Sequence, residues 1–72
     1  MTGDELRDQL TALDLSQAAF AELIGRDAGT VNRWCCDRTS PVPFIVVVLL
    51  TAYKMLSDRD RRHLRELATA NE

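Results

Sequence analysis

The sequence predicts an all-α domain built from five short helices. Apolar residues recur at intervals of three and four along most of the chain, which is typical of one buried helix face. Residues that commonly cap helices stand before several of these segments. The 72 residues are the size of a single domain, which we assign to 1–72.

A capping box marks the first helix. Thr2 and Glu5 have the spacing at which each side chain can bind the other residue's backbone N–H. They predict a helix from Gly3 to Leu13. Its apolar face is formed by leucines at helical spacing, namely Leu6, Leu10 and Leu13.

Two further helices follow, separated by a tight turn. Ser16 is a suitable N-cap for a helix over Gln17–Ile24, and Gly25 can end that helix in the left-handed region. Asp27 is a suitable N-cap for the next helix, Ala28–Cys36, because the helix dipole favours its negative charge. We expect the inward face of this helix to consist of Val31, Trp34 and Cys35.

The fourth helix is the most apolar segment of the chain. Residues 37–43 form a loop by composition, and FIVVVLL alone would fit a buried strand because β-branched residues favour strands. The apolar character continues to Leu56, so we predict a helix over Pro43–Leu56, with Pro43 in its first turn. A helix that is apolar on nearly every side must be covered on every side. We therefore expect one face to contact a second chain, through Phe44, Val47, Val48, Thr51, Tyr53 and Met55.

A second capping box, Ser57 with Asp60, predicts a fifth helix, which together with the fourth supports the domain over 43–69. We expect Leu64 and Leu67 to anchor this helix and residues 68–72 to fray. Its outward arginines can reach phosphates or, as we favour, pair with nearby acids. The arginines are Arg59, Arg61, Arg62 and Arg65, and the acids are Asp58, Asp60 and Glu66.

Charge and cysteine content restrict the function. The net charge of −2 counts against a nucleic-acid-binding protein, but it is unevenly distributed. Residues 1–14 carry four acids and one base, whereas residues 59–65 carry four arginines and one aspartate. The polar start, the adjacent pair Cys35–Cys36 and the short apolar run lead us to expect a cytoplasmic protein without a signal peptide or membrane span.

The segment from Ser16 to Trp34 carries a pattern of five residues in fixed order: Gln17, Ala21, Gly25, Val31 and Trp34. It resembles the helix-turn-helix of the Cro and phage-repressor type, known as the XRE family. The resemblance extends from about Leu13 to Leu56 and implies a lambda-repressor-like fold with the motif at 16–36. A plain αα-hairpin in a helical bundle is the alternative.

The resemblance implies that the third helix enters a DNA major groove while the second crosses the backbone. Gln17 would then hold a phosphate, Arg33 would recognise guanine, and Asn32 would recognise adenine or hold a phosphate. A solvated helix face is the alternative for Asn32 and Arg33. The full set of expected DNA contacts is Ser16, Gln17, Arg26, Ala28, Gly29, Thr30, Asn32, Arg33, Arg38 and Thr39.

The chain departs from the family pattern at several positions. Arg26 stands where the family often has an apolar residue, and it can serve as a phosphate contact instead. Asp27 brings a carboxylate near DNA, which is tolerable only if the carboxylate serves as a cap. Leu10 and Cys35 occupy the places of a buried Arg–Glu pair that is frequent in the family, and an apolar replacement of this kind need not reduce stability.

These observations predict a homodimeric transcriptional repressor that binds an inverted repeat in double-stranded DNA. In size the chain resembles phage or mobile-element autoregulators, including the small repressors associated with anti-CRISPR operons. The alternative is a protein-interaction module that has kept the scaffold and lost DNA binding. No residue pattern predicts an enzyme, a cofactor, a metal site or a small-molecule ligand, since the cysteines lack zinc spacing and no nucleophile–base pair is evident.

Overall fold

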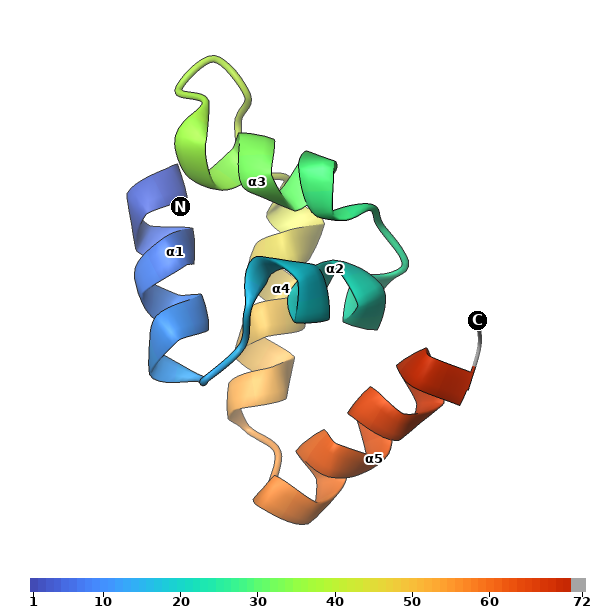
Figure 1. The fold of residues 1–72 in the computed structure, drawn as a ribbon. Coiled ribbons are helices and arrows are strands. Elements are labelled where there is room, and N and C mark those ends of the chain that lie inside the picture. Colours follow the sequence, from blue (N-terminus) through green and yellow to red (C-terminus); the bar gives the residue numbers. More distant parts are fainter. Residues whose placement is uncertain (71–72) are drawn as a thin grey trace.

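The computed structural model describes residues 1–70, and within them the chain forms five α-helices and no strand. The predicted all-α class is therefore confirmed. The helices are α1 (Gly3–Ala12), α2 (Gln17–Ile24), α3 (Ala28–Cys36), α4 (Phe44–Lys54) and α5 (Asp58–Ala70). In Figure 1, α3 crosses above α2 and α4, α1 flanks them on the left, and α5 runs away beneath α2.

The core lies between α1, α2, α3 and α4. Ten apolar residues are buried there, and within residues 58–70 helix α5 contributes none of them. Three of them lie on one face of α4 and complete the core from that helix. The ten are Leu6, Leu10, Leu15, Phe20, Ala21, Val31, Cys35, Val46, Leu50 and Tyr53.

Local capping explains where the first three helices begin and end. The capping box of Thr2 and Glu5 is present, with both reciprocal hydrogen bonds. The Ser16 hydroxyl accepts a hydrogen bond from the Ala19 N–H at 3.0 Å. Gly25 ends α2 in the left-handed region with φ 73°, as its position in the sequence predicted. α2 and α3 have the predicted bounds, and α1 is one residue shorter than predicted because Leu13 is its C-cap.

Gly3 brings the start of α1 against the end of α3 (Figure 1). A Cβ atom at this position would collide with the Trp34 carbonyl oxygen and lie 2.8 Å from the Cys35 carbonyl oxygen. Both obstacles are backbone atoms, which cannot rotate away. Glycine at position 3 is therefore a requirement of the fold.

α4 is shorter than predicted at both ends. Pro43 is the N-cap rather than a first-turn residue, because its ψ of 146° is extended. At the other end the chain leaves the helix at Met55, two residues after Tyr53. No helix within residues 1–70 is long and apolar enough to cross a membrane.

Two expectations about side-chain placement are wrong. Tyr53 was expected to face a second chain, but it is 5% exposed and belongs to this chain's own core. Leu64 and Leu67 were expected to anchor α5, but both are exposed, and the helix packs against α2 without burying any residue. Residues 68–70 were expected to fray, but they are helical; residues 71–72 lie outside the described part.

Arg61 holds the start of α5 against the end of α4. Its guanidinium donates hydrogen bonds to the carbonyl oxygens of Tyr53 at 3.0 Å and of Lys54 at 2.9 Å. The same group lies 5.3 Å from the centre of the Tyr53 ring, within cation–π range. Because the last carbonyls of a helix lack intrahelical partners, Arg61 works as a C-terminal cap of α4.

Candidate nucleic-acid interface

The α2–turn–α3 unit has a three-residue turn, Gly25 to Asp27, between two short helices. The turn is stabilised by the Arg26 N–H, which donates to the Ala21 carbonyl oxygen at 2.9 Å. Ala21 is buried at the point where the two helices meet, and its small side chain permits their close contact. The unit therefore has a fixed geometry that its own sequence largely determines.

The outer face of α3 is exposed and polar. Val31 and Cys35 are buried on the opposite face, and Trp34 is half-buried beside them, as predicted. The helical spacing brings Gly29, Arg33 and Cys36 to the middle of the outer face, with Ala28 and Asn32 on the side toward α2 and the half-buried Thr30 on the other side.

A hydrogen bond ties the two helices together on their exposed side. The Asn32 side-chain amide donates to the Gln17 Oε1 atom at 2.9 Å. It also lies 3.7 Å from the Cys36 sulfur. The two residues that were expected to contact DNA separately thus form one unit, in which the Asn32 Oδ1 atom and the Gln17 amide nitrogen remain for an outside partner. The sequence spacing alone did not predict this contact.

Asp27 caps the start of α3. Its carboxylate accepts a hydrogen bond from the Thr30 N–H at 2.6 Å. The Thr30 hydroxyl and N–H, with a smaller contribution from the Arg33 charge, hold the pKa of Asp27 below its ordinary value. The carboxylate is therefore ionised at neutral pH and neutralises part of the positive end of the α3 dipole.

Gly29 and Arg33 are adjacent on the outer face, one helical turn apart. Arg33 is exposed, and its guanidinium reaches the Thr30 hydroxyl at 3.4 Å. A Cβ atom at Gly29 would meet only the Asp27 carboxylate oxygen, at an ordinary 3.5 Å. The fold therefore does not require glycine at position 29, in contrast to Gly3.

The loop after α3 is organised by a carboxylate that the sequence analysis left without a role. Asp37 accepts hydrogen bonds from the Thr39 hydroxyl at 2.6 Å, the Thr39 N–H at 2.9 Å and the Ser40 hydroxyl at 3.3 Å. The Thr39 and Ser40 donors lower the pKa of Asp37, with a further contribution from Arg33. The Asp-x-Thr-Ser spacing is a recognisable local turn signal. Thr39 is thus already committed, and Arg38 remains the exposed donor of this loop.

The expected DNA-contacting residues all lie between Ser16 and Thr39, in α2, the turn, α3 and the loop that follows it. Ser16 is exposed, although its hydroxyl oxygen is used as a cap. Arg26 is exposed in the turn beside Asp27. The two cysteines differ, since Cys35 is buried, which raises the pKa of its thiol, whereas Cys36 is exposed on the outer face of α3.

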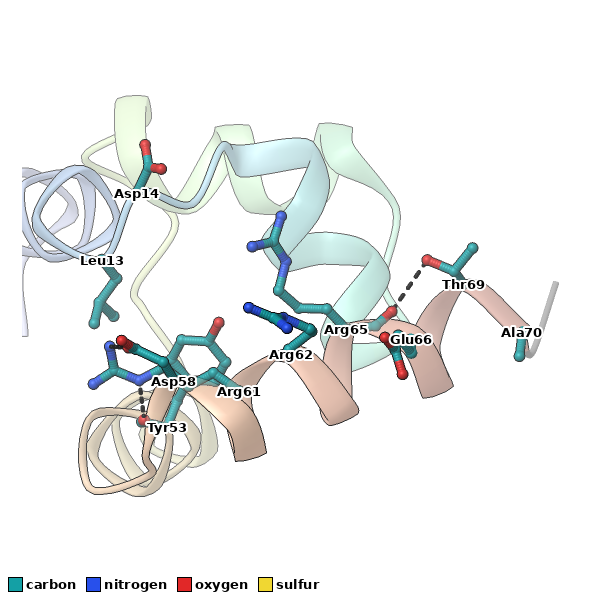
Figure 2. A pocket seen from close by; sticks show the side chains of 10 residues that line it. All are labelled: Leu13, Asp14, Tyr53, Asp58, Arg61, Arg62, Arg65, Glu66, Thr69 and Ala70. Carbon is teal, nitrogen blue, oxygen red and sulfur yellow. Dashed lines mark hydrogen bonds and ion pairs between the residues drawn. The ribbon is translucent and has the colours of Figure 1, made fainter.

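Three arginines of α5, namely Arg61, Arg62 and Arg65, line a groove of their own. Figure 2 shows Arg62 and Arg65 pointing from α5 toward α2 and the α1–α2 connection. The groove has a volume of about 740 Å³ and is also lined by Asp14 and Glu66. Within residues 58–70 the expected pairing with acids is seen once, between Arg61 and Asp58 at 3.9 Å.

Comparisons of the chain with protein-family models, with curated proteins and with solved structures give no significant match.

Proposed function

We propose that the chain is a sequence-specific, double-stranded-DNA-binding regulator that acts as a cytoplasmic homodimer and represses transcription. The observation that carries the proposal is the outer face of α3. There the exposed Arg33 lies one helical turn after Gly29, which has no side chain, and Asp27 caps the start of the helix. Arg33 would recognise guanine in the major groove through two hydrogen bonds. The Gln17–Asn32 pair would contact the phosphate at the groove edge or an adenine beside it.

The acidic residues near this face are compatible with the proposal. The Asp27 carboxylate accepts a hydrogen bond from the Thr30 N–H, and the Asp37 carboxylate accepts hydrogen bonds from Thr39 and Ser40. Their charge lowers the affinity of a single copy for phosphate, which makes pairing of two copies important. Two helices α3 related by a two-fold axis would enter successive major grooves about 34 Å apart and recognise an inverted repeat.

A gel-shift titration against DNA upstream of the protein's own reading frame tests the proposal. We expect a shifted complex whose affinity falls steeply with salt, because phosphate contacts release counterions. Arg33→Ala is expected to weaken binding about tenfold to a hundredfold and to relax base preference at one position of each half-site. Arg38→Ala is the matched control, since loss of a phosphate contact weakens binding equally to all sequences. Absence of any shift at low salt contradicts the proposal.

A second candidate is a protein-interaction module that uses the same scaffold without DNA. The exposed apolar residues of α4 favour it, since such surfaces mark protein contacts. A chain that fails the gel shift against a random pool of duplexes, yet associates through α4, would support this candidate.

A further inference from the structure

α4 carries an uncharged apolar stripe on the side turned away from the core. We define the outer stripe as Phe44, Ile45, Val48, Leu49, Ala52 and Met55. Counted from Phe44, these positions are i, i+1, i+4, i+5, i+8 and i+11, the last being the C-cap residue Met55, and they lie opposite Val46, Leu50 and Tyr53. Phe44 is 79% exposed and Met55 is 82% exposed, and no charged side chain interrupts the stripe.

We infer that this outer stripe is the surface through which two copies of the chain associate, with their α4 helices antiparallel. The inference rests on the proposed function for its biological role, because it supplies the homodimer that an inverted repeat requires. It also changes the expected contact set. Ile45, Leu49 and Ala52 enter it, Tyr53 leaves it for the core, and Thr51 moves to the rim, where its hydroxyl donates to the Val47 carbonyl oxygen at 2.8 Å.

Because the outer stripe is apolar and uncharged, the partner that fits it best is a second copy of the same stripe. An uncharged apolar surface is complemented by another of the same kind, and the chain itself provides one of equal length. The exposed side chains offer on the order of 500 Å². With the half-buried Val47 and the exposed Thr51 at the rim, this approaches the roughly 800 Å² that each partner contributes to a standard interface.

The distribution of side-chain sizes favours the antiparallel orientation. The largest exposed side chains, Phe44 and Met55, stand at the two ends of the stripe. A two-fold axis near the middle places Phe44 of one copy opposite Met55 of the other, where thioether and ring make a favourable contact. The outer face of α3 belongs to another helix and stays open for DNA.

Sedimentation velocity of the protein without DNA tests the inference. We expect a dimer at micromolar concentration, and in Phe44→Glu and Ile45→Glu a rise in the dimer dissociation constant of at least about tenfold. Glutamate in the first turn of α4 suits the helix dipole, so both variants should fold, which circular dichroism checks. Leu67→Glu is the matched control, because Leu67 on α5 is 54% exposed against 58% for Ile45.

The outcomes separate this inference from the proposed function. A wild-type monomer, or a dimer that Leu67→Glu dissociates and Ile45→Glu does not, overturns the outer stripe as the interface even if DNA binds. A stripe-dependent dimer that shifts no DNA leaves the inference standing and removes the proposed function.

The orientation is tested by disulfide trapping in a Cys36→Ser background, since Cys36 is the exposed native thiol. Mixing Phe44→Cys with Met55→Cys protein should give a 44–55 cross-link under mild oxidation. Cross-links joining two copies of residue 44 in place of 44–55 would overturn the antiparallel arrangement.

Discussion

The first three helices and the last two differ in how their starts are capped and in how much of their apolar surface the chain buries. Each of α1, α2 and α3 begins at a side chain that caps it, namely Thr2, Ser16 and Asp27. α4 begins at a proline without any side-chain cap. α5 is capped by the Ser57 hydroxyl, which accepts a hydrogen bond from the Asp60 N–H at 3.2 Å, but it buries no residue within 58–70. Of the large apolar residues exposed within residues 1–70, all except Met1 lie on α4, at its C-cap Met55 or on α5.

This difference indicates that the two parts serve different purposes. In the α1–α3 part the helix starts are capped by side chains, and polar side chains such as Gln17 and Asn32 hydrogen-bond to each other. In the α4–α5 part only the side of α4 that faces the core is buried, and apolar side chains on the other side are exposed. A chain of this length buries a limited core, so an apolar helix left half uncovered gains stability from association.

The largest expected effect contrasts the two sides of α4 with a single pair of substitutions. Leu50 is fully buried and its neighbour Leu49 is exposed on the outer stripe. Leu50→Ala should lower the free energy of unfolding by about 3 kcal/mol, through lost burial and the cavity left behind. Leu49→Ala should leave the monomer almost unchanged and weaken the dimer. Urea unfolding at low and high protein concentration distinguishes the two effects. Equal destabilisation of the monomer by both variants would contradict the division of α4 into a core side and an outer side.

The next effect tests how tightly the first part is assembled. Gly3→Ala should destabilise the fold by about 2 kcal/mol, because its Cβ atom would press on the Trp34 and Cys35 carbonyl oxygens. Thermal unfolding followed by circular dichroism measures this loss. Thr2→Ser keeps the cap and serves as the control at the neighbouring position. A Gly3→Ala protein as stable as wild type would mean that α1 and α3 are not in contact at this point.

The sequence predicted the first part better than the second for a physical reason. Helix ends that are set by local caps are visible in the sequence, so α2 and α3 have the predicted bounds. In the run from Phe44 to Leu50 every residue is apolar, and periodicity therefore does not indicate which face is buried. The wrong placement of Tyr53, three residues after this run, follows from this lack of contrast.

The sequence predicted which residues of the candidate interface are exposed, but it did not predict which of them contact each other. The sequence identified the outward residues of α3, because Val31, Trp34 and Cys35 define the opposite face. It did not predict the hydrogen bond between Gln17 and Asn32, which depends on how two helices cross. Gly3 was likewise visible only as a helix-start residue, since its constraint comes from backbone 31 to 32 residues away.

A smaller effect of opposite sign is expected at Gly29. The fold leaves room for a Cβ atom there, so Gly29→Ala should raise the stability of the free protein by about 1 kcal/mol through helix propensity. Under the proposed function the same methyl group should weaken DNA binding, because it moves α3 outward from the groove. Thermal unfolding and gel shift together test this. A variant that is more stable and binds DNA equally well would remove close approach as the explanation for this glycine.

The smallest effect concerns the cap of α3 and its dependence on pH. The pKa of Asp27 is lowered in the folded protein, chiefly by hydrogen bonds from Thr30. Its stabilising contribution is therefore fully present above the ordinary aspartate value of 3.8 and is lost as the pH falls through the lower folded value. Asp27→Ser keeps a cap that does not titrate, while Asp37, whose pKa is also lowered, titrates in both proteins and cancels from the comparison. The difference in melting temperature between wild type and Asp27→Ser should thus shift in favour of the variant as the pH is lowered from about 5 to about 2. A difference that stays constant over this range would show that the Asp27 carboxylate does not hold the start of α3.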